Sequence, residues 1–370
     1  MKTFQVELKK VVDDSYEVQI GKDLIRDLVE DLKNGLLNGI KKFAVITDSN
    51  VAPLYGEPVC EAIKKAGFLA ELFVFPAGEK SKVRKTKEEL EDAMLQKGFR
   101  RDCAVIAVGG GVVTDLAGFV AGTFGRGVPV VNYATSNLAA ADASIGGKTA
   151  VDTDLATNLI GLIYQPKKVY VDIATWKTLP MEHRINGLAE TVKHACLADY
   201  ELFCYLEDHT EEILNCKEEE CVYISEHNCM VKYQVVMKDE KEKNLREILN
   251  LGHTVGRAIE TVSGYQLLHG QAVSIGLMAQ ARLGVQLGFM TEEELLRLER
   301  LLVKIGLPVT IPSYINKEEL IQKLYTDKKV RDGKLRFVFE KGIGEVMTFG
   351  EEVYARPTAE EEIRAIIEEM

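Results

Sequence analysis

The stretch LREILNLGHTVGRAIE carries polar residues whose types could bind an anion or a metal. Arg246, Asn250, His253 and Arg257 follow one another at intervals of four, three and four residues, which places them on one face of a predicted helix. None is apolar, so the row is either a solvated surface or a buried polar site. Two glycines in the same stretch each cost about 1 kcal/mol in a helix. They favour the buried site, because close approach by another element or a ligand would explain that cost.

Two further residues could act together with His253. His269 lies in LLHGQAV, and Glu190 precedes Lys193 by three residues in LAETVKH. One carboxylate and two imidazoles suit zinc and leave a coordination position open for a substrate. The alternative is that each histidine is an isolated polar group. The other four histidines have no such context: His183, His194, His209 and His227.

A run of three glycines, Gly109 to Gly111, follows the β-rich segment CAVIAV and precedes a helical pattern that opens at Val112. Glycines let backbone N–H groups approach a phosphate, and a helix N-terminus adds partial positive charge. The pattern therefore suits a dinucleotide pyrophosphate, although it matches neither Gly-x-Gly-x-x-Gly nor a P-loop. A tight turn without a ligand is the alternative.

A second glycine cluster follows in TSNLAAADASIGGKTAVD, where Asp142 precedes Lys148 by six residues. A lysine after a glycine turn can meet an anionic group, and an aspartate can accept hydrogen bonds from hydroxyl groups. An exposed flexible loop is an equally weighted alternative.

The elements that must position these residues differ between the two halves of the chain. Short β-rich runs at 43–48, 70–78, 103–111, 128–135 and 168–173 alternate with helical patterns such as Thr86 to Lys97. This alternation predicts a parallel sheet covered on both faces. At the start of the chain, Phe4 to Leu8 and Tyr16 to Ile20 resemble a β-hairpin.

From about residue 178 the sequence has helical periodicity with almost no strand runs. The predicted helical segments are 189–197, 221–236, 245–262, 272–287 and 291–305. A terminal helix is expected from Thr358, which forms a capping box with Glu361, and its apolar face carries Ile363, Ile366 and Ile367. We therefore predict an α/β domain at 1–177 and an all-α domain at 178–370.

The composition bounds the function. A chain of 370 residues suits about two domains. Its net charge of −11 argues against nucleic-acid and anionic-membrane partners, whereas a few pocket cations could still bind a small anion. The N-terminus lacks the apolar core of a signal peptide, and the seven cysteines contain no Cys-x-x-Cys pair. These features predict a cytoplasmic protein.

Seven segments together resemble, in order, the motifs of the 3-dehydroquinate synthase family of sugar-phosphate cyclases. They are GGGVVTDLAGF, GRGVP with Arg126, DASIGGKT, NLIGLIYQP, LAETVKH, LNLGHT and LHGQAV. The resemblance extends from about Phe43 to Lys329. It implies an NAD-binding α/β domain, an all-α metal-binding domain and an active site between them in a homodimer.

The resemblance also implies a reaction of the shikimate pathway of aromatic amino acid biosynthesis. A seven-carbon keto acid phosphate is transiently oxidised by NAD+, loses phosphate by β-elimination, is reduced again and closes by an intramolecular aldol step. The enzyme is a lyase, and NAD is recycled within each turnover. The implied metal is Zn2+, with Co2+ as the alternative.

The family's functional residues correspond to many positions of this chain. The implied metal ligands are Glu190, His253 and His269. The implied substrate contacts are Asp142, Lys148, Asn158, Lys193, Lys232, Arg246, Asn250, Arg257, one of Lys328 and Lys329, and Arg126, which in this family reaches the partner subunit's site. The implied NAD contacts are Asp48, Gly78, Glu79, Lys82, Gly110, Gly111, Val112, Val113, Thr114, Asp115, Thr135, Ser136, Lys148, Thr175, Trp176, Lys177 and Thr178.

The chain departs from the family pattern at four places. Ala156-Thr157-Asn158 replaces Gly-Lys-Asn, Arg257 replaces a histidine, Thr114 replaces a glycine, and Ala134-Thr135-Ser136 replaces Pro-Thr-Thr. These departures leave a related cyclase, such as an amino-dehydroquinate synthase, as the nearest alternative substrate class. Retained Arg246 and Lys232 favour a carboxylated substrate. A metal-dependent polyol dehydrogenase and a non-catalytic NAD-binding protein are the alternatives from other classes.

Overall fold

The computed structural model describes residues 3–8, 11–325 and 334–370. The first half of the chain forms a six-stranded sheet with the order β1-β8-β5-β4-β2-β3, and every neighbouring pair is parallel. Its strands are β1 (Glu17–Gly21), β2 (Lys42–Asp48), β3 (Leu69–Phe75), β4 (Cys103–Gly109), β5 (Val130–Ala134) and β8 (Lys168–Asp172). An antiparallel pair, β6 (Lys148–Val151) and β7 (Ile160–Ile163), lies outside this sheet. The predicted parallel sheet is confirmed.

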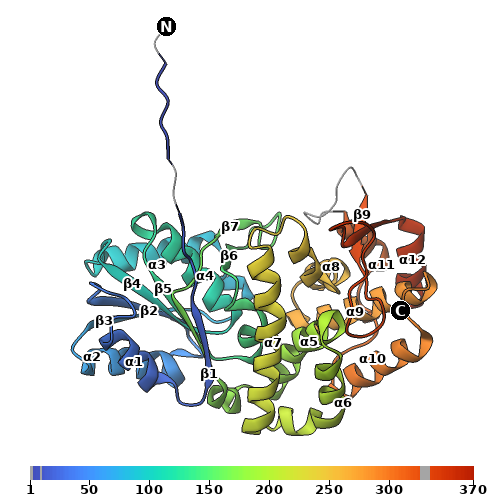
Figure 1. Ribbon diagram of the computed structural model, residues 1–370, viewed down its shortest axis with the longest axis horizontal. Coiled ribbons are helices and arrows are strands. Elements are labelled where there is room, and N and C mark those ends of the chain that lie inside the picture. The colour runs from blue at the N-terminus through green and yellow to red at the C-terminus, as the bar shows by residue number, and fades with distance from the viewer. Residues whose placement is uncertain (1–2, 9–10, 326–333) are drawn as a thin grey trace.

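Helices cover both faces of the sheet (Figure 1). They are α1 (Ile25–Lys33), α2 (Glu57–Lys65), α3 (Arg84–Gln96) and α4 (Gly111–Thr123). Within β2, Phe43 and Val45 belong to the apolar cluster of α1 and α2, whereas Ala44 and Ile46 belong to that of α3 and α4. The strand is apolar at successive positions because both of its faces are buried.

The strand order reverses between β2 and β4. The chain passes from β2 to β3 on one side of this point and from β4 to β5 on the other. In open parallel sheets, ligands bind outside the carboxyl ends of the strands at such a reversal. Short helical turns complete the connections here and elsewhere: η1 (Ala52–Gly56), η2 (Glu79–Ser81), η3 (Phe124–Arg126), η4 (Ala139–Ala143), η5 (Ile173–Thr178) and η6 (Leu245–Asn250).

The second half is predominantly helical, as predicted (Figure 1). Its helices are α5 (Met181–Ala198), α6 (Tyr200–Leu214), α7 (Glu218–Lys238), α8 (His253–Val262), α9 (His269–Gln286), α10 (Glu292–Ile305), α11 (Lys317–Leu324) and α12 (Glu360–Glu369). The prediction of an all-α domain missed one small antiparallel pair, formed by β9 (Leu335–Val338) and β10 (Ala355–Thr358). None of the described helices is both long and apolar enough to cross a membrane.

The apolar core of the helical half reaches into the sheet. Val169 and Val171 of β8 belong to the same cluster as the buried residues of α5 and α9. The predicted domain boundary after residue 177 falls within η5, next to this shared core.

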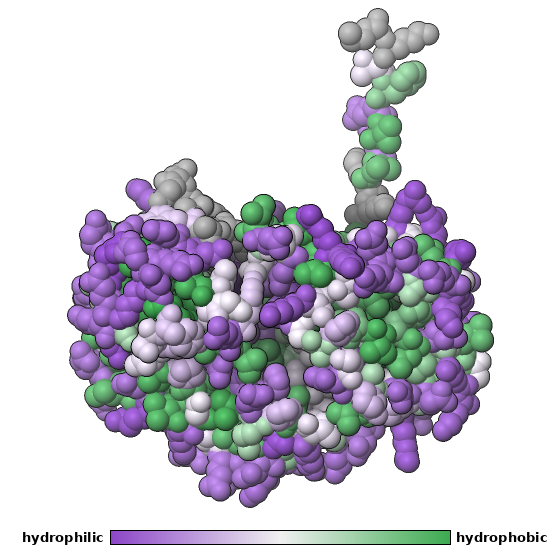
Figure 2. Space-filling view, turned by 180° about the vertical axis from the view of Figure 1, so that it is seen from behind, coloured by the Kyte–Doolittle hydropathy of each residue, from purple (hydrophilic) through white to green (hydrophobic). Residues whose placement is uncertain are grey.

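Two local expectations were wrong. Residues 3–8 form no strand, and β1 pairs in parallel with β8 instead of forming a hairpin, because Val18 and Ile20 pack against the core of the helical half. The apolar side chains of the N-terminal segment are exposed, and the segment stands clear of the body (Figure 2).

The cap of the terminal helix lies one residue later than predicted. Helix α12 is capped at Ala359, whose N–H donates to Glu362 Oε2 at 2.8 Å, instead of by Thr358 and Glu361. The apolar face of this helix is buried as expected.

Candidate active site

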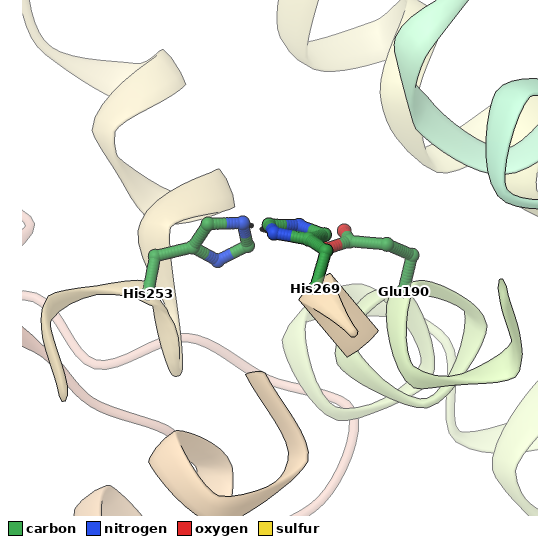
Figure 3. A group of neighbouring side chains, drawn as sticks. All are labelled: Glu190, His253 and His269. Atoms are coloured by element: carbon green, nitrogen blue, oxygen red, sulfur yellow. Dashed lines mark hydrogen bonds and ion pairs between the residues drawn. The ribbon is translucent and has the colours of Figure 1, made fainter. Parts of the chain in front are cut away.

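Three side chains from three helices converge in the second half of the chain (Figure 3). Glu190 comes from α5, His253 from α8 and His269 from α9. The Nε2 atoms of His253 and His269 lie 3.4 and 3.3 Å from Glu190 Oε1. Zinc bonds of 2.0–2.1 Å in a tetrahedron place neighbouring ligand atoms about 3.3 Å apart. The spacing of these donors therefore fits a tetrahedral divalent metal.

The rings of both histidines are oriented by partners on their other nitrogen. His253 Nδ1 lies 3.0 Å from the carbonyl oxygen of Leu251, and His269 Nδ1 lies 3.4 Å from Glu260 Oε2. Such partners fix the tautomer that leaves Nε2 available to a metal. Glu260 lies two helical turns after His253, on the same face of α8, so helical spacing could have identified it from the sequence.

Burial and charged neighbours shift the pKa values of all three side chains. Burial raises the pKa of Glu190, but Lys193 and His253 outweigh it and hold the pKa below the ordinary value. Burial lowers the pKa of His253 well below its usual range. At His269 burial opposes protonation, yet Glu260 and Glu190 raise the pKa to about 10. A divalent metal bound here would replace the proton of His269, since metal and proton compete for one nitrogen.

The predicted polar row does not lie on one helix. Arg246 and Asn250 belong to η6, Gly252 has a φ of 75°, and α8 begins only at His253. The prediction of one continuous helical face was wrong, because the left-handed backbone at Gly252 separates the two elements. The interpretation of the glycines is confirmed: a Cβ on Gly256 would lie 3.0 Å from the Ala272 carbonyl oxygen, so α9 approaches closely.

Arg246 is fully buried and is held by carbonyl oxygens. Its Nη1 donates to the Glu240 oxygen at 2.6 Å, and its Nη2 donates to the Gly146 oxygen at 2.9 Å. Among the described residues no carboxylate lies within 4.0 Å of its guanidinium, and Nε has no hydrogen-bond partner. A buried cation without a paired anion costs free energy, so this arrangement suits an anionic ligand.

A second group of charges surrounds Asp142 on η4. Lys232 contacts both the backbone oxygen of Asp142 and its Oδ1, the latter at 2.5 Å. Burial would raise the pKa of Asp142, but Lys232 and Lys193 hold it well below the usual value. Lys193 also contacts Glu190. Two ammonium groups therefore contact the buried carboxylate of Glu190 and the partly exposed carboxylate of Asp142, and both carboxylates are ionised.

His194 lies beside these carboxylates, although we had expected it to have no role in a site. Ligand atoms of Asp142, Glu190 and His194 lie within 4.8 Å of one another, and Nδ1 of His194 lies 2.9 Å from Asn228 Oδ1. Burial lowers the pKa of His194 to about 4, so the ring is neutral. Its position four residues after Glu190, on the same helix face, was the available signal.

Glu242 brings together two of the predicted substrate residues. Lys148 Nζ lies 2.9 Å from Glu242 Oε2, and Asn250 Nδ2 donates to Glu242 Oε1 at 3.0 Å. Glu242 itself has a φ of 54°. No sequence pattern marked this glutamate, because its neighbours are 94 and 8 residues away in the chain.

Asn158 and Arg257 line one pocket of about 120 Å³, between the segment 153–159 and helix α8. Asn158 has a φ of 54°, and its N–H donates to Asp152 Oδ1 at 2.8 Å. Lys323 of α11 also lines this pocket. The structure thus brings two predicted substrate residues and a further lysine to one place.

The glycine turn lies at the strand-order reversal. The first hydrogen bond of α4 runs from Thr114 N to the Gly110 oxygen at 3.0 Å, so the three preceding N–H groups are the free donors of this helix. A Cβ on Gly110 would lie 3.2 Å from Ser136 Oγ. Thr114 is accommodated because its hydroxyl donates to the Gly111 oxygen at 3.0 Å. The glycine turn, the free N–H groups at the start of α4 and the place of both at the strand-order reversal fit a bound pyrophosphate.

The buried Lys82 lies among three carboxylates at the same edge. It contacts Glu79 and lies 3.6 Å from Asp115 and 3.7 Å from Asp152. Burial raises the pKa of Asp115 to about 7, although Lys82 opposes the shift. Asp48, at the end of β2, accepts hydrogen bonds from the backbone of residues 50 and 51.

The remaining predicted residues lie in different surroundings. Thr175 donates to the Thr135 oxygen at 3.1 Å, which ties two predicted nucleotide positions together. Trp176 is buried in the core of the helical half. Arg126 is exposed on η3 with a φ of 68°. Lys328 and Lys329 lie outside the described residues.

The fold and site define a class of two-part proteins, in which an open parallel sheet with a glycine turn adjoins helices that carry a candidate Glu-His-His metal site. Two family models match successive parts of the chain: 3-dehydroquinate synthase N-terminal at residues 72–186, and 3-dehydroquinate synthase C-terminal at residues 187–330. The chain belongs to the 3-dehydroquinate synthase family.

Individual proteins agree with this placement. A 3-dehydroquinate synthase of Caldanaerobacter subterraneus subsp. tengcongensis is 44% identical over 82% of this chain and 86% of its own length. The solved 2-epi-5-epi-valiolone synthase of Streptomyces hygroscopicus subsp. jinggangensis, with NAD+ and Zn2+ bound, has a TM-score of 0.87 and 28% identity, covering 99% of each chain.

A more distant solved structure shares the fold alone. A probable glycerol dehydrogenase from Sinorhizobium meliloti has a TM-score of 0.62 and 15% identity, covering 95% of each chain. The architecture is therefore common to cyclases and dehydrogenases, and the residues of the site, not the fold, distinguish their functions.

Proposed function

We propose that this protein is a 3-dehydroquinate synthase that uses NAD+ and a divalent metal, with Zn2+ favoured over Co2+. It converts 3-deoxy-D-arabino-heptulosonate 7-phosphate to 3-dehydroquinate and phosphate. The observation that carries the substrate assignment is Arg246, a fully buried guanidinium bound only to carbonyl oxygens among its described neighbours. A carboxylate is its natural partner, because guanidinium and carboxylate form paired charge-assisted hydrogen bonds.

When bound, NAD+ supplies reversible hydride transfer at one carbinol, and the metal supplies Lewis-acid polarisation of the neighbouring oxygens. We propose that Glu190, His253 and His269 hold the metal. The free N–H groups of the turn at Gly110 hold the pyrophosphate.

The other polar residues orient the substrate. We assign Asp142 with Lys193 to its hydroxyl groups, because Lys193 contacts Glu190 and a carboxylate oxygen of Asp142 lies within 4.8 Å of a Glu190 oxygen. We assign Arg246 to its carboxylate, because its buried guanidinium contacts carbonyl oxygens alone among the described residues. Lys148, Asn158 and Arg257 suit a phosphate. The burial of Glu190, Lys193 and Arg246 limits the access of water to reactive intermediates.

Two alternative functions differ from this proposal in their anion requirements. Some branches of the sugar-phosphate cyclases act on substrates without a carboxylate, and such a substrate would leave the buried guanidinium of Arg246 without an anionic partner. A polyol dehydrogenase shares the fold, but it needs no cations for its neutral substrate. Arg246 therefore favours the cyclase with a carboxylated substrate, because Lys148, Lys193 and Lys232 each contact a carboxylate of the chain, whereas the guanidinium of Arg246 contacts none among the described residues.

The activity itself gives a direct test. Purified protein with Zn2+ and NAD+ is expected to release one phosphate per molecule of 3-deoxy-D-arabino-heptulosonate 7-phosphate, with no net absorbance from NADH, because the hydride returns within each turnover. Phosphate release and NADH absorbance are followed in one cuvette. Steady NADH formation on glycerol without phosphate release would support the dehydrogenase instead.

We further propose a cytoplasmic homodimer whose phosphate site is completed by Arg126 of the partner subunit. The exposed position of Arg126 on η3 supports the shared site, because an exposed side chain can reach a partner subunit. The seven free thiols support the cytoplasmic location, because free thiols persist in a reducing compartment. Arg126→Ala is expected to raise KM for the substrate about tenfold or more, through the loss of a charge-assisted hydrogen bond. Mixing this variant with His269→Ala should restore part of the activity in heterodimers, whereas an unchanged rate for Arg126→Ala would exclude its participation.

A further inference from the structure

Tyr16 connects the N-terminal segment to the candidate substrate site. It lies immediately before β1, and its hydroxyl oxygen accepts a hydrogen bond from the Gly146 backbone N–H at 2.9 Å. The two residues are 130 positions apart in the chain, so only the fold brings them together. Burial raises the pKa of the Tyr16 phenol, which therefore remains a neutral group.

Gly146 also contacts Arg246. Its carbonyl oxygen accepts from Arg246 Nη2 at 2.9 Å, so Gly146 is held by Tyr16 on one side and holds the guanidinium on the other. The backbone here has a φ of 87°, and a Cβ on Gly146 would lie 2.6 Å from Arg246 Nη2. A displacement of Gly146 would therefore change the position of the guanidinium, and it would also shift Lys148 two residues later.

The chemistry of this chain of contacts suits an anion site. A phenol and a carbonyl orient the guanidinium through neutral groups, which leave its charge available, whereas a carboxylate would neutralise it. Without the phenol oxygen, the Gly146 N–H would lack its acceptor. An unpaired, largely buried donor is unfavourable enough to displace a glycine turn.

We propose that Tyr16 is a positioning residue of the substrate site: its hydroxyl holds Gly146, and Gly146 in turn aims Arg246 at the carboxylate of the substrate. The identity of that anion rests on the proposed function. The contacts from Tyr16 to Arg246 do not depend on it.

The test compares Tyr16→Phe with the unchanged protein, both loaded with Zn2+ and NAD+. Loss of one hydrogen bond that orients a charged group should raise KM for 3-deoxy-D-arabino-heptulosonate 7-phosphate about tenfold and leave kcat within about twofold. Hydrogen exchange measured by mass spectrometry should show faster exchange of the Gly146 amide. Gly146→Ala should raise KM in the same way, because the added methyl group would displace the guanidinium of Arg246 directly.

Tyr170→Phe is the matched control. Its hydroxyl donates to Asp31 Oδ2 at 2.5 Å, and its ring packs on the α1 and α2 side of the sheet. This variant loses a phenol hydrogen bond in the same half of the protein, but KM and Gly146 exchange should stay unchanged.

The outcomes separate this proposal from the proposed function. Unchanged Gly146 exchange in Tyr16→Phe overturns the proposal whatever the enzyme acts on, and faster exchange with unchanged KM overturns the role in substrate binding. Absence of phosphate release from the unchanged protein contradicts the proposed function alone. In that case KM is replaced by the dissociation constant of the same compound, measured by calorimetry. If the unchanged protein and Tyr16→Phe have equal dissociation constants, or if neither binds the compound, the role of Tyr16 in binding this substrate is overturned.

Discussion

His269→Ala is expected to abolish stoichiometric metal binding and to lower kcat/KM by about 1,000-fold, the effect of losing about 4 kcal/mol of transition-state stabilisation. The Nε2 of His269 lies 3.3 Å from Glu190 Oε1, a spacing that suits two ligands of one metal. With only Glu190 and His253 left, the metal would have two protein ligands. Metal content by atomic emission and phosphate release after dialysis check both effects.

Glu260→Gln is the control variant, because Glu260 orients His269 but is not itself a proposed metal ligand. Its carboxylate contacts His269 Nδ1, so the variant keeps all three proposed ligands and should weaken metal binding by only about 10–100-fold. Activity of Glu260→Gln should recover in excess Zn2+, whereas that of His269→Ala should not. A fully active His269→Ala protein without metal would remove this histidine from the site.

Arg246→Met is expected to lower kcat/KM by about 100-fold or more for a carboxylated substrate, because a buried charge-assisted pair is lost. Methionine fills part of the same volume without charge. The loss should be dominated by KM if Arg246 binds the carboxylate equally in the ground and transition states. Steady-state kinetics with the heptulosonate phosphate measure the effect.

A substrate analogue in which the carboxylate is replaced by a hydroxymethyl group provides the control. The unchanged protein should discriminate strongly against this analogue, and Arg246→Met should discriminate little. Arg246→Lys keeps the charge but loses the two-pronged geometry, so it should lie between the two. Equal discrimination by all three proteins would contradict the assignment of Arg246 to the carboxylate, and thermal unfolding of each variant shows whether the fold is retained.

The parallel sheet could be predicted because its strands are apolar at nearly every position. In β4, alternate residues from Cys103 to Val108 face opposite helical layers, and only a strand covered on both faces needs such a run. The glycines that begin at the last residue of β4 marked the turn, because the close approach of helix α4 requires a glycine there: a Cβ on Gly109 would lie 2.4 Å from Val113.

Local pattern failed where distant packing decided the structure. The alternating start of the chain suggested a hairpin, yet β1 pairs with β8, 151 residues away at Glu17 and Lys168. Helical spacing suggested one continuous row from Arg246 to Arg257, yet the left-handed backbone at Gly252 divides it. In both cases the local preference was weak compared with burial against the helical half.

The residue types of the candidate site, and their resemblance to one family, were available from the sequence by itself: a Glu-His-His set, a glycine turn and several cations within an acidic chain. Their partners were not, because Tyr16, Glu242, His194 and Glu260 gain their importance from contacts that only the packed helices and sheet create. Contacts and burial arise when distant segments meet. They leave Arg246 as a buried guanidinium with no direct ion pair among the described residues, and they make His253 a neutral imidazole. The tertiary structure therefore decided which of the plausible residues form a site.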